Sequence, residues 1–318
     1  MFDVCCVGIL VADVIVKPVS QMPEKGILSP VDSIELFSGG NAMTASINLR
    51  KMGISSAVVG MVGDDMFGEF LKSCLKKYDV CTDGLKTTDK AQTSASTLLI
   101  SDEGERSFWH CVGANGIFSD KDIDMEIIKK SKIVFVTGTN LLDTFDGQQT
   151  ADFLKECKNL GKTTALDVCW DHKGRWGDIL IKAMPYIDIF MPSIDEAREI
   201  SKENTPEKMA DKFFEYGVKS VVIKCGSDGC YIRESKGKNG IMIPACKGIT
   251  AVDTTGAGDS FCSGFLASYS KGNDFETCAL MGNAVGAHCV MEKGATTGIK
   301  SYEQMYDFML ERKEGKTC

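Results

Sequence analysis

Continuous apolar runs separated by helical segments constrain the fold of this chain more than any other feature. Six runs are apolar along their length rather than alternating: Val4–Leu10, Ala57–Val62, Ile133–Val136, Thr164–Asp167, Ile187–Met191 and Val221–Lys224. Runs of this kind are typical of strands in a mainly parallel sheet with both faces covered. The helical segments between them are Ala42–Met52, Phe67–Tyr78, Gly147–Leu160, Ile194–Ser201, Pro206–Tyr216, Gly258–Ser270 and Phe275–Met291. The alternation predicts an α/β fold with a mainly parallel central sheet and helices on both faces.

Two segments interrupt this alternation and predict a small β lid. The first, residues 14–37, contains Pro18, Pro23 and Pro30, which argue against a helix. The second, residues 93–112, has two strand-like halves around a polar turn, which indicates a hairpin. We expect both to form a small sheet beside the main domain. The chain has no repeat or linker, so residues 1–318 are predicted to form a single domain.

Charge and cysteine usage exclude several classes of function. A net charge of −8 gives no general attraction to nucleic acid, and no apolar run is long enough to span a membrane. The 14 cysteines are scattered, without a Cys-x-x-Cys pair or a cluster with histidines. This pattern is typical of a reducing compartment in which cysteine packs in the core. We therefore expect a cytoplasmic protein with no nucleic-acid or membrane partner.

The segment that carries the most chemistry precedes the helix Gly258–Ser270 and reads Asp253-Thr254-Thr255-Gly256-Ala257-Gly258-Asp259. Glycines at a helix start let a ligand approach the backbone, and the N–H groups of the first turn attract anions. A carboxylate there, Asp259, is placed to take a proton from an attacking hydroxyl. Taken alone, the motif is more typical of a tight turn in which Asp259 favours the helix N-terminus.

Two further glycine motifs are weaker when each is taken alone. Ser38-Gly39-Gly40-Asn41 is also typical of a turn with Asn41 as helix cap, and Lys224-Cys225-Gly226-Ser227-Asp228-Gly229 of a turn between strands. The chain contains no Walker A motif. It also has no Gly-x-Gly-x-x-Gly after the first strand, which counts against a nicotinamide oxidoreductase.

Together, the stretch from Gly39-Gly40-Asn41 to Gly53 and the segment 253–259 resemble the two signatures of the ribokinase-like (PfkB) carbohydrate kinases. The resemblance covers essentially the whole chain, since the hairpin around Arg106 and the 224–229 loop also follow the family's order. It implies an ATP-dependent kinase that transfers the γ-phosphate to a sugar hydroxyl, with ATP and Mg²⁺ as cofactors and a small sugar as substrate.

The resemblance also implies roles for individual residues. Asp259 resembles the general base, and the backbone of Gly256, Ala257 and Gly258 resembles the anion hole for the γ-phosphoryl group. The residues that resemble the sugar site are Asp13, Gly39, Gly40, Asn41 and, reaching from the lid, Arg106; a solvated arginine is the alternative for Arg106. The residues that resemble the nucleotide site are Lys224, Gly226, Ser227, Gly229 and Asn283.

Two metal sites follow from the same resemblance. Glu196 resembles the carboxylate that organises the hydration shell of Mg²⁺, as expected for a cation that keeps its waters. The family's Asn-x-x-Glu is altered here, because Ser193 stands where the amide is common. Asp253 and Thr255 match a loop that binds a monovalent cation in some members, so activation by K⁺ is left open.

Several alternatives remain at the level of sequence. A nucleoside kinase would use lid aromatic residues, Phe108 and Trp109, to stack on a base. A non-catalytic sugar-binding or regulatory protein would have no chemical need for Asp259 and the glycine hole. The lid hairpin is also suited to pairing across a two-fold axis, which predicts a homodimer.

Two more segments are expected to face the substrate. Trp109 and His110 lie on the lid hairpin, and the loop Asp167–Trp176 follows a core strand, where open α/β sheets bind ligands. In that loop, Asp171 and Arg175 either recognise hydroxyl or acid groups of the substrate or form a local ion pair.

Overall fold

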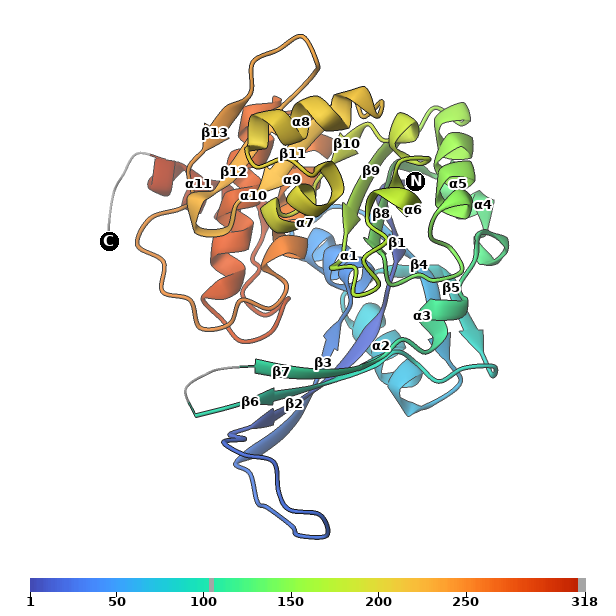
Figure 1. Cartoon of the computed structure of the whole chain (residues 1–318), viewed down its shortest axis with the longest axis vertical. Coiled ribbons are helices and arrows are strands. Elements are labelled where there is room, and N and C mark those ends of the chain that lie inside the picture. The colour runs from blue at the N-terminus through green and yellow to red at the C-terminus, as the bar shows by residue number, and fades with distance from the viewer. Residues whose placement is uncertain (103–105, 314–318) are drawn as a thin grey trace.

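The computed structural model describes residues 1–102 and 106–313, and it consists of an α/β core with a small separate sheet at one side (Figure 1). In the described residues, the central sheet has nine strands in the order β13-β12-β11-β10-β9-β8-β1-β4-β5. Their bounds are β1 Phe2–Gly8, β4 Ser56–Gly63, β5 Cys81–Thr88, β8 Ser131–Thr139, β9 Thr163–Val168, β10 Ile189–Phe190, β11 Ser220–Lys224, β12 Cys230–Arg233 and β13 Ile241–Ile243. Among the described strands of this sheet, only the pairings of β11 with β12 and of β12 with β13 are antiparallel, so the predicted mainly parallel sheet is confirmed.

Helices cover both faces of this sheet, as the apolar runs predicted. Alternate residues of β1 show the two layers, because Val4 and Cys6 enter one hydrophobic core and Cys5 and Val7 enter the other. The first core includes α1 Asn41–Lys51, α2 Met66–Lys77, α9 Ala257–Ser270, α10 Phe275–Val290 and α11 Tyr302–Lys313. The second includes α3 Ala114–Ile117, α4 Met125–Lys129, α5 Gln148–Asn159, α6 Gly177–Leu180, α7 Ile194–Ser201 and α8 Pro206–Glu215. Three short 3₁₀ turns complete the described elements: η1 Asp120–Asp122, η2 Met184–Tyr186 and η3 Gly226–Asp228.

The lid is a four-stranded sheet in the order β3-β2-β6-β7, below the core in Figure 1. Its strands are β2 Val11–Lys17, β3 Ser33–Gly39, β6 Ala95–Ile100 and β7 Arg106–Cys111. The lid was predicted, but its first boundary was wrong. The apolar run Val4–Leu10 spans the end of β1 and the passage into β2, so the lid begins at Val11 rather than at residue 14, and Asp13 lies on a lid strand.

The two faces of the lid carry different side chains. Strand register puts Asp13, Ser96 and His110 side by side on one face. The next residues, Val14, Thr97 and Trp109, point to the opposite face because side chains alternate along a strand. Trp109 and His110 therefore lie on opposite faces of the lid, and contact of either with the substrate stays a prediction.

No described helix combines the length and the apolar character that crossing a membrane requires.

Candidate active site

The start of α9 has the geometry of an anion-binding turn. Gly256 precedes the helix with φ +74°, a left-handed conformation that favours glycine, and a side chain there would overlap Ala295. Ala257, Gly258 and Asp259 form the first turn, where backbone N–H groups lack partners within the helix. The predicted anion hole therefore lies at a helix N-terminus with close backbone access.

Asp259 points from this turn toward the start of α1. The Asn41 side-chain amide donates a 2.6 Å hydrogen bond to Asp259 Oδ1. The pKa of Asp259 is raised to about 6, mainly by burial and to a smaller extent by the carboxylates of Glu196 and Asp13, against the opposing effects of Lys224 and the Asn41 amide. Gly40, not Asn41, is the N-cap of α1, so the Asn41 amide is used at Asp259 rather than as a helix cap.

A buried ion pair lies beside Asp259. The Lys224 ammonium, at the end of β11, is 2.7 Å from Asp167 Oδ2 at the end of β9, and their side chains are only 12% and 2% exposed. Burial raises the pKa of Asp167, an effect that Lys224 opposes. A Cβ placed on Gly258 would lie 3.5 Å from Lys224 Nζ, so the ammonium is close to the anion-binding turn. From sequence, Asp167 was expected only as the first residue of the substrate-facing loop Asp167–Trp176, and its pairing with Lys224 was not predicted.

Glu196 is held at the start of α7 by a capping box. Ser193 N donates to Glu196 Oε2 at 2.7 Å, and Glu196 N donates to Ser193 Oγ at 3.4 Å. Burial raises the pKa of Glu196, Lys224 lowers it and Asp167 raises it. Ser193, the departure from the family pattern, thus orients Glu196 through its backbone and hydroxyl. A hard oxygen donor near the anion-binding turn fits the predicted role toward hydrated Mg²⁺.

A cavity of about 440 Å³ opens beside the same turn. Its lining includes the predicted nucleotide-site residues Lys224, Gly226, Ser227, Gly229 and Asn283, together with Ala257 and Gly258. The Asn283 amide donates to the carbonyls of Ile243 and Pro244 at 3.2 and 3.1 Å, so it also holds one wall of the cavity. A largely apolar cavity lined at one point by an anion-binding turn offers surfaces for both an apolar base and charged phosphates.

The lid supplies the other side of the site. The pKa of Asp13 is raised to about 6, because the effect of burial outweighs the opposing hydrogen bond of the Ser96 hydroxyl. A side chain at Gly39 would overlap the Asp13 carboxylate, so this glycine lets Asp13 approach the start of α1. Ser96 Oγ lies 3.1 Å from His110 Nδ1, which extends the polar row across three lid strands. The row Asp13, Ser96 and His110 offers the hydrogen-bonding groups that hydroxyls require.

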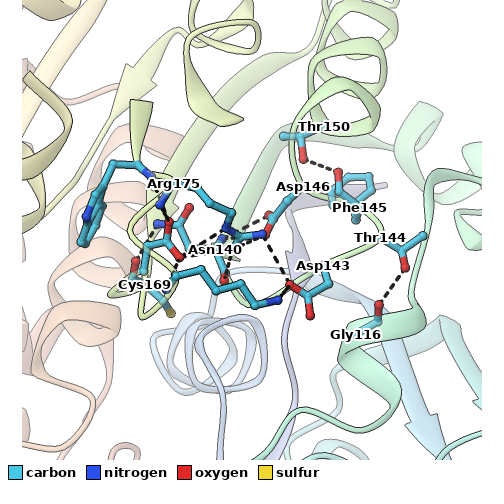
Figure 2. Close-up of polar contacts among 12 residues, drawn as sticks. Gly116, Asn140, Asp143, Thr144, Phe145, Asp146, Thr150, Cys169 and Arg175 are labelled. Atoms are coloured by element: carbon cyan, nitrogen blue, oxygen red, sulfur yellow. Dashed lines mark hydrogen bonds and ion pairs between the residues drawn. The ribbon is translucent and has the colours of Figure 1, made fainter. Parts of the chain in front are cut away.

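The loop after β9 forms a local ion-pair network, shown in Figure 2. Arg175 donates to the Asn140 carbonyl at 2.9 Å and lies within 3.3 to 3.8 Å of carboxylate oxygens of Asp171, Asp143 and Asp146. Asp171 also accepts hydrogen bonds from backbone N–H groups of its own loop. Of the two predicted roles for Asp171 and Arg175, this geometry favours the local ion pair.

The Asp253 loop and Arg106 were also predicted to belong to the site. Both Asp253 oxygens accept backbone hydrogen bonds, from Thr255 N and Gly294 N, each at 2.9 Å, so Asp253 braces this loop; K⁺ binding at Asp253 and Thr255 stays a prediction. The Arg106 side chain lies outside the described residues, and only its backbone pairing with Ile100 is known. Among the described residues, no group of three or more His, Cys, Asp or Glu side chains is arranged to hold a metal ion by itself.

Known proteins with similar sequences include sugar kinases. A sugar kinase of Archaeoglobus fulgidus without a characterised substrate is 28% identical over 256 residues, which cover 80% of this chain and 98% of the relative. An ATP-dependent 6-phosphofructokinase of Thermoanaerobacterium thermosaccharolyticum is 27% identical over 322 residues, covering 96% of this chain and 94% of the relative.

The fold is that of the ribokinases. The structure of an Arabidopsis thaliana ribokinase, described as complexed with ribose and ATP, superposes with a TM-score of 0.83 at 23% identity, covering 97% of this chain and 98% of that chain. The sequence pattern of the pfkB family of carbohydrate kinases matches residues 1–301. Most of the chain is thus matched, and the protein belongs to the pfkB carbohydrate kinase family, whose members are phosphotransferases that act on sugar-type alcohols.

Proposed function

We propose that this protein is an ATP- and Mg²⁺-dependent carbohydrate kinase that transfers the γ-phosphate of ATP to a hydroxyl of an uncharged sugar. Asp259 is the general base and the backbone of residues 256–258 is the anion hole. One observation carries the proposal: the half-buried Asp259 carboxylate lies between the apolar cavity and the polar lid row, at the turn suited to a phosphoryl group.

Each described group of the site has a separate role in the proposed reaction. A carboxylate with a pKa of about 6 is ionised at neutral pH, yet it is basic enough to accept the proton of an attacking hydroxyl. The N–H groups at the start of α9 and the Lys224 ammonium stabilise negative charge on the transferred group. Glu196 would hold Mg²⁺ through water, and an ion bound there would supply positive charge at the phosphates.

Charge around the lid row favours an uncharged acceptor. In the loop after β9, Arg175 contacts three carboxylates and Lys173 pairs with Asp143, so these two cations are already engaged by acidic groups of the protein. The Asp13 carboxylate already raises the pKa of Asp259, because two negative charges lie close together. A phosphate or carboxylate on the acceptor would add a further negative charge beside them.

An acceptor panel tests this function directly. ADP release with Mg²⁺-ATP is measured against matched pairs of neutral sugars and their phosphates or acids, and against nucleosides. We expect a neutral sugar to be preferred by about 100-fold in kcat/KM, because placing like charges together costs several kcal/mol. Preference for a sugar phosphate, the substrate type in the name of one relative, would overturn the uncharged acceptor but leave the kinase intact.

A nucleoside acceptor is the second candidate. Phe108 is 60% exposed and lies on the same lid face as Asp13, where a base would stack. In the panel, turnover of a nucleoside with none of the free sugars would select this candidate.

We also propose that two copies associate through the lid. Ile34, Leu36 and Trp109 are exposed and share the lid face opposite Asp13, where a partner would bury them. Light scattering should give a dimer, and Trp109→Lys should shift it to monomer. Met242→Lys, at another exposed apolar position, on β13, should leave the dimer unchanged. A monodisperse monomer of the unmodified protein would contradict the proposal.

A further inference from the structure

Cys169, directly after β9, contacts the group that holds Asp259. Its thiol donates a hydrogen bond to Asn41 Oδ1 at 3.1 Å, and the nitrogen of the same amide donates to Asp259 Oδ1 at 2.6 Å. The Asn41 amide is therefore bonded at both ends, on one side by a thiol and on the other by the carboxylate. The family resemblance assigned Asn41 to the sugar site, and Cys169 was expected only as part of the substrate-facing loop Asp167–Trp176.

The thiol is a permanent donor at this place. Burial raises the pKa of Cys169 well above its ordinary value, and the carboxylates of Glu196, Asp259 and Asp167 raise it further. The sulfur thus keeps its proton across the pH range in which an enzyme is assayed. With the amide turned over, its oxygen would face the Asp259 carboxylate and its N–H₂ would face the thiol proton, so a single orientation satisfies both neighbours.

Hydrogen bonds to its backbone hold Cys169 in place. Its N–H donates to the Thr139 carbonyl at 2.8 Å, and its own carbonyl accepts from the Asn140 amide at 2.8 Å. Asn140 has a left-handed backbone, φ +87°, and its N–H donates to the buried Asp146 carboxylate at 3.1 Å. Figure 2 shows this support, in which Arg175 joins Asn140 and Asp146. A strained backbone of this kind persists only where its surroundings hold it.

We propose that Cys169 is a positioning residue for phosphoryl transfer: its thiol holds the Asn41 amide so that the amide stays on the carboxylate of Asp259. The inference rests on the proposed role of Asp259 as the base. Cys169 touches neither the nucleotide cavity lining nor the lid row in the described contacts, so it acts through Asn41.

The test compares Cys169→Ala with Cys169→Ser. Loss of one neutral hydrogen bond should lower kcat about three- to tenfold in the alanine variant, with the KM for ATP unchanged. The Asn41 contact lowers the pKa of Asp259, so the acid limb of the kcat/KM profile should move to higher pH. Serine restores a donor and should return both values toward those of the unmodified enzyme. Cys81→Ala, a half-buried cysteine on the edge strand β5, is the matched control and should change neither.

A double-mutant cycle with Asn41→Ala isolates the mechanism. If Cys169 acts through Asn41, adding Cys169→Ala to Asn41→Ala should lower kcat no further. An unshifted acid limb in Cys169→Ala, or equal damage from serine and alanine, would overturn the inference. Failure of the proposed function looks different, because Asp259→Asn would then keep its activity. If Asp259→Asn loses activity but Cys169→Ala changes neither kcat nor the acid limb, the positioning role alone would be rejected.

Discussion

Asp259→Asn should lower kcat by about 10³-fold while the affinity for ATP is retained, because asparagine keeps the shape of the base but cannot accept the proton of the acceptor hydroxyl. Steady-state ADP release and calorimetric titration with a non-hydrolysable ATP analogue measure the two quantities. Glu69→Gln is the matched control, since Glu69 is also a carboxylate in the first turn of a helix, but it is paired with Lys72 on the surface. Activity surviving in Asp259→Asn would contradict the assignment of the base.

The pH dependence of both activity and stability follows from the same carboxylate. Activity of the unmodified enzyme should fall below about pH 6, where Asp259 becomes protonated. The folded pKa lies above the unfolded value of 3.8, so protonation favours the native state. The stability that Asp259 contributes is complete below pH 3.8 and is lost as the pH rises through 6. Asp259→Asn should therefore stabilise the protein at pH 8, by on the order of 2 kcal/mol, and have little effect near pH 4.

Lys224→Met should lower the free energy of unfolding by about 3–5 kcal/mol, because it leaves the Asp167 carboxylate buried without its partner. It should also lower kcat, since the ammonium beside Gly258 is removed. Urea unfolding and ADP release measure the two effects on the same preparation. Lys212→Met removes an exposed pair with Glu215 and should cost less than about 1 kcal/mol.

The double substitution Lys224→Met with Asp167→Leu separates the two roles of the pair. With both charges gone, the buried pair is replaced by apolar packing, so most of the lost stability should return. The kcat should stay low, because the positive charge beside the anion-binding turn is still missing. Recovery of kcat together with stability would show that Lys224 is purely structural.

Sequence patterns predicted the core well where apolar runs and helix signals agree. The segment Ile194–Ser201 is α7 with the predicted bounds, and Gly258–Ser270 differs from α9 by one residue. The strand β5, Cys81–Thr88, was missed because its sequence, Cys-Thr-Asp-Gly-Leu-Lys-Thr-Thr, contains no apolar run. As the edge of the sheet it is partly exposed, so burial did not select apolar residues there.

The site was predictable only in the parts that are local in sequence. Glycine turns and the carboxylate at a helix start are visible as motifs, which is why the predicted nucleotide-site residues line one cavity. The pairing of Lys224 with Asp167 and of Cys169 with Asn41 depends on which strand ends meet, and the spacing along the chain does not encode that. The role of Arg175 was open for the same reason, since its partner Asp146 lies on a separate loop.

The lid carries Asp13 on a sheet of its own, whereas Asp259 and the turn before it belong to the core. Under the proposed function, the lid's share of acceptor recognition and the phosphoryl chemistry are therefore encoded in separate parts of one polypeptide. Substitutions along four short strands can alter which alcohol is recognised without disturbing the packing that holds the base. An engineer seeking a new acceptor should accordingly exchange lid residues around Asp13, Ser96 and His110 first, and leave the junction of α1 and α9 untouched.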